Sequence, residues 1–469
     1  MSASNWHRRT VLGILPALLA TPALAQGLAG DWEGVLIVGG PRLRIRLHLT
    51  QALGGIAATM DSPDQGAWGL AASAVEVDGS KIKITWAFGI FEGTQAGDIL
   101  EGTWIQGSKL SLKLARIGSK AAADLVATAA VVKPLDRPQV PKAPFPYTSE
   151  DVEFDNPTVP GVRLAGTLTL PPGKGPFPTV VLIAGSGPNN RDERLLDHPV
   201  FLVLADWLTR QGIAVLRYDK RGVAGSKGDY LHATSTDFAS DVDAALGYLR
   251  GRKDIDRKRL GLVGHSEGGY IAPMVAAKDP KVAFIVLMAG PAVLGSEILA
   301  LQGRLIAQAS GTPTTMLDST EKTNRATFEV IRTASSDEDA YTKARAVLTA
   351  GNPTFAPAML DAMAKQLSSP WMRFMLSYDP AIDLRKVRCP VLAINGSKDL
   401  QVPASQNLPA MRASLSHNRD ATILELPGLN HIFQTATTGS PTEYGEITET
   451  ISPVALKTIS DWIVAHTKA

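Results

Sequence analysis

The side chain best placed to do chemistry is a serine that lies between glycines. Residues 260–263 form a short apolar run that leads into Gly264-His265-Ser266-Glu267-Gly268, and a helix-forming segment follows. The pattern G-x-S-x-G between a strand and a helix is typical of a sharp turn that lifts a serine hydroxyl away from the backbone. Glycines are needed there because neighbouring elements come close. We predict that Ser266 is a nucleophile; the alternative is a chance occurrence of the pattern in a glycine-containing chain.

A nucleophilic serine needs a general base, and the position of the histidines selects one. When the serine sits on such a turn, the base follows it in the chain and lies in a loop after a late strand. His417 ends an amphipathic helix among polar residues, and His466 lies in the terminal helix. His431 follows the strand-like run 422–426 through a short loop. We therefore predict His431 as the base, the alternative being a structural histidine.

The base in turn needs a carboxylate that holds the imidazole in the right tautomer and stabilises the imidazolium. The apolar run 391–394 predicts the strand before the His431 strand, and the loop after it carries Asp399. We predict that Asp399 orients His431. A turn or helix-cap aspartate is the alternative.

A negatively charged oxygen that forms during acyl transfer needs backbone N–H donors. One donor is expected from Glu267, the residue after the nucleophile. The other is expected from the loop after strand 179–184, where Ser186 is best placed. The Gly-Ser-Gly of that loop could also suggest a phosphate loop, but no Gly-Lys-Ser/Thr sequence accompanies it.

The elements that position these residues begin near residue 150. From there, apolar strand-like runs alternate with amphipathic helices, which predicts an α/β fold with a mostly parallel sheet and helices on both faces. Residues 295–385 interrupt the alternation with a helical, Met-rich stretch, and we expect a lid inserted between two strands. Trp371, Met372, Phe374 and Met375 at its end either wall an acyl pocket or form the lid core.

The chain before residue 150 has a different texture. Residues 27–130 show period-two alternation with glycine-rich turns, which predicts a small all-β barrel or sandwich. Its tryptophans Trp32, Trp86 and Trp104 are interpreted as core residues rather than a ligand site. Residues 131–149 carry frequent prolines and are expected to form an extended linker. We therefore expect a chain that starts near Asp151 to fold and work without the β-domain.

The N-terminus resembles an export signal. Residues 1–25 contain Arg8 and Arg9, then a short apolar run, then an Ala-x-Ala cleavage site. The arginine pair is consistent with a twin-arginine signal, and an ordinary secretory signal is the alternative. We expect an exported protein, periplasmic or secreted.

Composition excludes several classes of protein. One cysteine, Cys389, rules out an intrachain disulfide and a multi-cysteine metal site. A net charge of +2 gives no basic stripe for nucleic acid. Beyond the signal, no apolar run is long enough to span a membrane. The oligomeric state is left open.

Five motifs in the second part of the chain carry a family resemblance: Ala184-Gly185-Ser186-Gly187-Pro188, Arg217-Tyr218-Asp219-Lys220-Arg221-Gly222, Gly264-His265-Ser266-Glu267-Gly268-Gly269, Gly396-Ser397-Lys398-Asp399 and Asn430-His431. On these motifs, residues 150–469 resemble the α/β-hydrolase superfamily, in particular secreted bacterial serine esterases related to the serine-aminopeptidase and dienelactone-hydrolase-like branches, with a fused N-terminal β-domain. The resemblance implies cleavage of a small-molecule ester through an acyl-enzyme, without metal or organic cofactor.

Two other functions stay open at this point. A peptidase or amidase would use the same three residues, although the lid shows no acidic cluster for a peptide amino terminus. A non-catalytic protein that binds the cell envelope through its β-domain is the third reading, and the intact set of Ser266, Asp399 and His431 argues against it.

Overall fold

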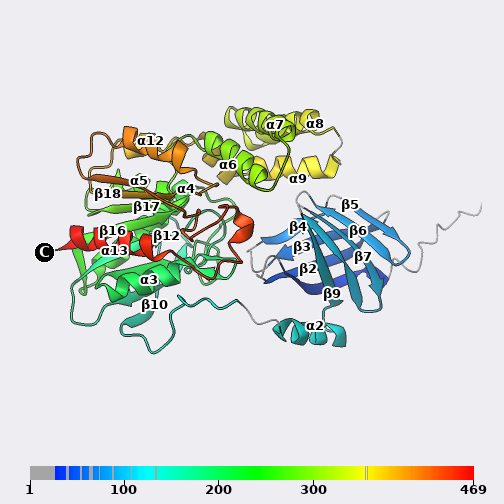
Figure 1. Ribbon diagram of the computed structural model, residues 1–469, viewed down its shortest axis with the longest axis horizontal. Helices are drawn as coiled ribbons and strands as arrows, with labels where there is room; N and C mark the ends of the chain where they lie inside the picture. The colour runs from blue at the N-terminus through cyan, green and yellow to red at the C-terminus, as the bar shows by residue number, and fades with distance from the viewer. Residues whose placement is uncertain are drawn as a thin grey trace, which may run out of the picture.

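A computed structural model shows a β-barrel-like part beside a larger α/β part, with a group of helices above them in the view of Figure 1. The structure describes residues 27–37, 42–52, 55–62, 67–72, 74–86, 89–106, 108–131, 135–353, 355 and 357–468. The predicted export signal, residues 1–25, lies outside these ranges.

The N-terminal part is one antiparallel sheet in the order β4-β3-β2-β1-β9-β8-β7-β6-β5. Strands β3 and β5 also approach each other, so the sheet curls into an almost closed barrel. Trp32, Trp86 and Trp104 are buried inside it, which supports their interpretation as core residues. The strands are β1 (Gly30–Ile37), β2 (Arg42–Ala52), β3 (Gly55–Ser62), β4 (Ala67–Ala71), β5 (Ala74–Asp78), β6 (Lys81–Trp86), β7 (Gly89–Ala96), β8 (Ile99–Gln106) and β9 (Ser108–Arg116).

The end of this part corrects one prediction. Residues 27–130 were expected to be all β, but α2 (Lys120–Val131) is a helix that packs on β9 and β1. The segment is rich in alanine, the residue with the highest helix propensity, and the Ser119 hydroxyl caps its start by accepting the Ala122 N–H at 3.1 Å. Hydrophobic periodicity gave no signal because alanine is short and weakly apolar.

The C-terminal part is built on an eight-stranded sheet in the order β10-β11-β15-β12-β16-β17-β18-β19. The first two strands run antiparallel to their neighbours, and all pairs from β15 to β19 are parallel. The strands are β10 (Thr148–Asp155), β11 (Arg163–Leu170), β12 (Phe177–Ile183), β15 (Ala214–Tyr218), β16 (Ile255–His265), β17 (Ile285–Met288), β18 (Val391–Gly396) and β19 (Ala421–Leu426).

Helices bury both faces of this sheet, so the predicted fold class is confirmed. One core contains residues of α4 (Ser235–Gly251), α5 (Gly268–Ala276) and α12 (Ala404–Ser414). The core on the other face contains residues of α3 (Val200–Arg210) and α13 (Pro453–Thr467).

Five helices are inserted between β17 and β18, where a lid was expected. They are α6 (Gly295–Ala309), α7 (Thr314–Arg332), α8 (Asp337–Gly351), α9 (Pro357–Leu367) and α10 (Pro370–Ser377), followed by the short α11 (Ala381–Leu384). Phe328, Ile331, Leu348 and Leu376 belong to a small core of their own. None of the helices in the described ranges is both long and apolar enough to cross a membrane.

The proline-rich segment before β10 is bound to the α/β part over its length. The Arg137 guanidinium donates to the carbonyls of Gly445 (2.8 Å) and Ile447. The Gln139 side chain donates to the Ile451 carbonyl at 2.6 Å and accepts the Thr450 N–H at 2.6 Å. We call residues 135–147 the strap, because it runs from the barrel along the C-terminal loops rather than as a free spacer.

The two parts also meet through a short hairpin, β13 (Arg194–Leu195) and β14 (His198–Pro199), with Leu196 in its turn. Leu196 packs against both the barrel core and the core that contains α3 and α13. The hairpin belongs to the loop after β12, which carries Ser186. The barrel therefore touches the loop that was expected to supply an N–H donor.

Candidate active site

The turn between β16 and α5 holds Ser266 in a strained conformation. Its φ is +53°, a left-handed value that non-glycine residues rarely adopt, and strain of this kind clusters at active sites. The turn is tight because two glycines let backbones approach. A Cβ on Gly264 would lie 1.9 Å from the Gly268 carbonyl oxygen, and one on Gly268 would lie 2.0 Å from the Ile183 oxygen. The sequence pattern around Ser266 thus has a direct steric cause.

Asp399 and His431 meet at the ends of the neighbouring strands β18 and β19. The Nδ1 of His431 lies 2.9 Å from Oδ2 of Asp399, and both side chains are buried. The other carboxylate oxygen of Asp399 accepts the backbone N–H groups of Gln401 and Val402, each at 2.8 Å. These two hydrogen bonds hold the carboxylate in place. It can therefore orient the imidazole and select its tautomer, as the acid of a catalytic triad does.

His265, which precedes Ser266, contacts His431 and so places the predicted base at the same edge of the sheet as the nucleophile. The rings of His265 and His431 have centroids 4.9 Å apart, and Nε2 of His265 lies 3.1 Å from the His431 carbonyl oxygen. Within the described residues, the Ser266 hydroxyl has no hydrogen-bond partner, so its bond to the base is not made in this structure. Catalytic hydrogen bonds are often long without substrate and tighten when it binds.

The two expected N–H donors flank Ser266. Gly185 lies so near that a Cβ on it would be 3.1 Å from the Ser266 Cβ, which places the adjacent Ser186 beside the nucleophile. Among the described residues, the backbone N–H groups of Ser186 and Glu267 have no acceptor. Two unpaired donors on either side of a serine fit an oxyanion hole.

Glu193, which sequence reasoning missed, supports this arrangement. Its Oε1 accepts the Gly185 N–H at 2.5 Å and lies 2.9 Å from Nδ1 of His265. Burial lowers the pKa of His265, but the charge and hydrogen bond of Glu193 outweigh it, and the pKa lies above its ordinary value. Glu193 itself has a left-handed φ of +43°. No local pattern marks this residue, because its partners are brought in by the fold.

A second missed residue, Lys220, lies behind the site. Its ammonium donates to the Gly185 carbonyl at 2.6 Å and to Oε2 of Glu267 at 2.8 Å. The sequence marked Lys220 in one way: it lies between Asp219 and Arg221 in the Arg217–Gly222 motif that carries the family resemblance. Those two neighbours have structural contacts: Asp219 binds Arg191, and Arg221 binds Asp241.

The residues at the end of the lid divide between two environments. Met372 packs with the lid core, whereas Trp371, Phe374 and Met375 pack against the sheet core that contains α4 and α5. The Trp371 indole N–H also donates to Oε1 of Glu267 at 2.7 Å. Core packing therefore accounts for much of this set, and Trp371 connects the lid to the residue after the nucleophile.

Together, the sheet order, the strained serine turn and the buried Asp–His pair define an α/β-hydrolase. The chain belongs to the X-Pro dipeptidyl-peptidase (S15) family, which matches residues 160–424. The matched range includes Ser266 and Asp399 and ends before His431.

Relatives of known name cover only part of this chain. Esterase EstD of Thermotoga maritima is 29% identical over 269 residues, which are 57% of this chain and 58% of EstD. Thiohydrolase apmlB of Arthrinium phaeospermum is 34% identical over 142 residues, which are 29% of this chain and 42% of apmlB. The chain thus spans about half the length of these relatives.

Solved structures resemble the chain at low identity. The Pyrococcus furiosus esterase Pf2001 is 14% identical with a TM-score of 0.42, covering 68% of this chain and 90% of that one. Est1E of Butyrivibrio proteoclasticus, solved with ferulic acid bound, is 15% identical with a TM-score of 0.41, covering 67% and 98%.

Proposed function

We propose that the protein is a serine hydrolase that cleaves carboxylic esters through an acyl-enzyme. The observation that carries the proposal is the buried Asp399–His431 pair, bonded at 2.9 Å, at the same sheet edge as the strained Ser266. The named esterase relative agrees with an ester substrate.

The proposed reaction begins with attack of Ser266 Oγ on the acyl carbonyl while Nε2 of His431 takes the hydroxyl proton. The negative charge on the carbonyl oxygen is stabilised by the N–H groups of Ser266's neighbour Glu267 and of Ser186. His431 then protonates the leaving alcohol. Water, deprotonated by His431, attacks the acyl-enzyme, releases the acid and restores Ser266. Asp399 stays ionised and stabilises the imidazolium in both halves.

The test is hydrolysis of a panel of p-nitrophenyl esters of increasing acyl length, together with labelling by a fluorophosphonate. We expect turnover of short esters and one covalent adduct that peptide mapping places on Ser266. Ser310→Ala, a change on the exposed end of a lid helix, is the matched control and should react like the parent. Failure of the parent protein to react with the label would favour a non-catalytic envelope-binding role.

A peptidase or amidase is the second candidate, and the match to a dipeptidyl-peptidase family favours it. Recognition of a peptide amino terminus requires a free carboxylate near the nucleophile. Both oxygens of Glu267 are already occupied, by Lys220 and by Ser235 and Trp371. Faster cleavage of aminoacyl-anilides than of short esters would overturn the ester assignment.

We also propose that the protein is exported, on the basis of Arg8, Arg9 and the cleavage site within residues 1–25. Replacing both arginines by lysine distinguishes the routes. Loss of the mature form from the envelope fraction indicates twin-arginine export, and unchanged processing indicates the ordinary secretory route.

A further inference from the structure

Lys220 forms a brace between the two loops that carry the unpaired N–H donors. Its ammonium binds the carbonyl of Gly185, which precedes Ser186, and the carboxylate of Glu267, which follows Ser266. Lys220 comes from the loop after β15, while the two partners follow β12 and β16. Because β12 lies between β15 and β16 in the sheet, the side chain reaches across the end of one strand to join three loops.

The brace is buried, so its charges must be balanced within the protein. Lys220 is 5% exposed and Glu267 3%. The ammonium also lies 4.5 Å from the centre of the Phe238 ring, a favourable cation–π contact. A buried ion pair holds its geometry strongly, because separating the two charges leaves each one desolvated and unpaired. Lys220 therefore resists any change in the distance between the Gly185 loop and the Glu267 turn.

The second oxygen of Glu267 extends the brace to two helices. Oε1 accepts the Ser235 hydroxyl at 2.5 Å, from α4, and the Trp371 indole N–H at 2.7 Å, from α10. Since α10 belongs to the inserted lid, Trp371 connects the lid to Glu267, whose backbone N–H is one of the two proposed oxyanion donors.

We propose that Lys220 is a positioning residue that sets the spacing of the Ser186 and Glu267 N–H groups, and that Trp371 couples the lid to this spacing through Glu267. The inference rests on the serine hydrolase function proposed above. Lys220 does not touch the substrate. It acts on the charged tetrahedral state, in which the carbonyl oxygen needs both donors, and much less on the bound ester.

The first variant is Lys220→Met, which keeps an unbranched side chain one atom shorter and removes its charge. We expect kcat for a short p-nitrophenyl ester to fall by about 10- to 100-fold, less than the 10²–10³ typical of deleting a donor, with KM changed by less than about threefold. Affinity for an alkylboronic acid, which bonds reversibly to Ser266 Oγ and places a negative oxygen in the hole, should fall in parallel.

A specific readout separates positioning from general support. A thionoester carries sulfur in place of the carbonyl oxygen, and sulfur accepts hydrogen bonds weakly. The ratio of kcat/KM for the ester to kcat/KM for the matched thionoester, which we call the ester preference, should therefore be above one in the parent enzyme. This ratio should be smaller in Lys220→Met. A purely structural role would lower the stability and leave the preference unchanged.

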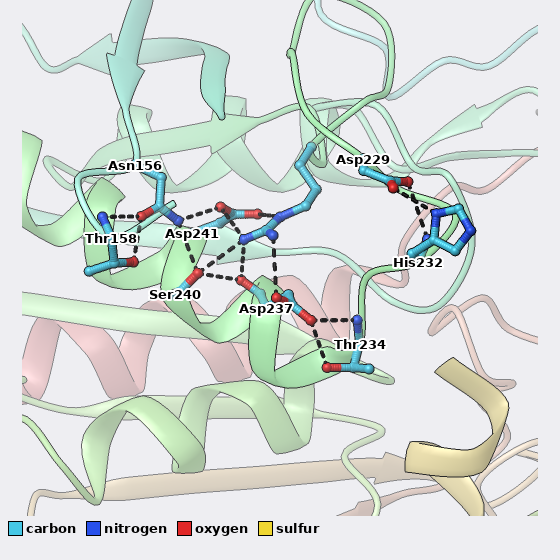
Figure 2. Close-up of polar contacts among 9 residues, drawn as sticks. Asn156, Thr158, Asp229, His232, Thr234, Asp237, Ser240 and Asp241 are labelled. Carbon is cyan, nitrogen blue, oxygen red and sulfur yellow. Dashed lines mark hydrogen bonds and ion pairs between the residues drawn. The ribbon is translucent and has the colours of Figure 1, made fainter. Parts of the chain in front are cut away.

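Because Lys220→Met leaves the Glu267 charge buried and unpaired, the double variant Lys220→Met/Glu267→Gln is tested beside it. The matched control is Arg221→Met/Asp241→Asn, which removes a pair of similar burial with its Nε–Oδ2 distance at 2.8 Å. Figure 2 shows that Asp241 belongs to a hydrogen-bonded cluster with Asn156 and Ser240. We expect both double variants to lose thermal stability, and only the first to lose the ester preference.

Trp371→Phe provides a variant at a half-buried position that keeps an aromatic ring and loses the indole N–H. Like Lys220→Met, it should lower kcat and the ester preference, but each by a smaller factor. If Ser266→Ala is inactive, the proposed function holds. The inference is then overturned if the Lys220 and Trp371 variants keep both the kcat and the ester preference of the parent. An inactive parent enzyme would instead contradict the proposed function itself.

Discussion

His265 and His431 are joined by a hydrogen bond from the ring of the first to the backbone of the second: Nε2 of His265 lies 3.1 Å from the His431 carbonyl oxygen. The opposite nitrogen, Nδ1, faces the Glu193 carboxylate at 2.9 Å. Both nitrogens donate at once only in the imidazolium form. In that form His265 ties the loop of the predicted base to the nucleophile turn and, through Glu193, to Gly185.

The first prediction concerns pH. Burial lowers the pKa of His265, but Glu193, with a further contribution from the charge of Asp399, raises it above 6.5 overall. The pair therefore stabilises the fold fully below about pH 6.5 and less as the pH rises through the folded-state pKa. Urea unfolding at several pH values should show this decline in the parent protein and not in Glu193→Gln. Parallel pH dependences of the two proteins would contradict it.

The second prediction concerns the nucleophile. Ser266→Ala should lower ester turnover by more than about 10³-fold, because the attacking oxygen is removed. The melting temperature should stay close to that of the parent, since alanine meets the same φ of +53° that serine already adopts. Circular dichroism and the ester assay check both points. Retention of more than a few per cent of the activity would remove Ser266 from the mechanism.

The third prediction concerns the acid. Asp399→Asn should lower kcat by about 10⁴-fold, because an amide no longer fixes the His431 tautomer. The loop should persist, since the amide oxygen still accepts the N–H groups of Gln401 and Val402. Asp420→Asn is the matched control: it alters an exposed Asp–His contact, with His466, and should leave kcat unchanged. A loss below tenfold would point to another carboxylate.

The fourth prediction concerns the tight turn. Gly264→Ala should destabilise the fold and abolish activity, because its Cβ would lie 1.9 Å from the backbone oxygen of Gly268. The control is Gly247→Ala, an exposed glycine inside α4 with nothing within 4 Å of the added Cβ. That change should stabilise the protein by up to about 1 kcal/mol. Thermal unfolding and ester turnover distinguish the two, and equal melting temperatures would refute the steric argument.

The fifth prediction revises the expectation for a chain without the β-barrel. A chain that starts near Asp151 loses both the strap and the first residues of β10 (Thr148–Asp155). One that starts at Leu135 keeps the contacts of Arg137 and Gln139. We expect the longer chain to hydrolyse a small soluble ester and to melt at a higher temperature than the shorter one. Equal melting temperatures would mean that the strap contributes nothing to stability.

The same longer chain, which lacks the β-barrel, also tests whether the barrel contributes to the active site. Leu196 packs against the barrel core and lies in the loop that carries Ser186. If the chain from Leu135 is soluble and monodisperse yet inactive, the barrel contributes to the active site and the two parts do not work independently.

Local patterns predicted the features that local sterics determine. The turn around Ser266 could be recognised from consecutive residues, because a side chain on Gly264 or Gly268 would clash with the backbone of neighbouring segments. The strands and helices of the α/β part follow from runs of apolar residues, and the order serine, acid, histidine selected Asp399 and His431, which the structure brings together.

Contacts between distant segments could not be predicted in this way. Nothing near Glu193 indicates that it binds His265, because the contact depends on the loop after β12 folding back onto β16. The same holds for Lys220 and Glu267, which are joined across a strand. Helix α2 was missed for another reason: its alanines favour a helix without giving an apolar stripe.

The strap also has a consequence for the order of folding during synthesis. Arg137 and Gln139 bind carbonyls that lie 308 to 312 residues later in the chain, close to its end. The barrel is complete soon after it leaves the ribosome, since its strands pair within residues 30–116. These partners of Arg137 and Gln139 emerge late, whereas Tyr147 at the other end of the strap donates to Asp206, which emerges much earlier. The first part of the strap is therefore fixed late in biosynthesis, and a nascent chain stalled before Gly445 would carry a folded barrel whose strap lacks the contacts of Arg137 with Gly445 and Ile447 and those of Gln139.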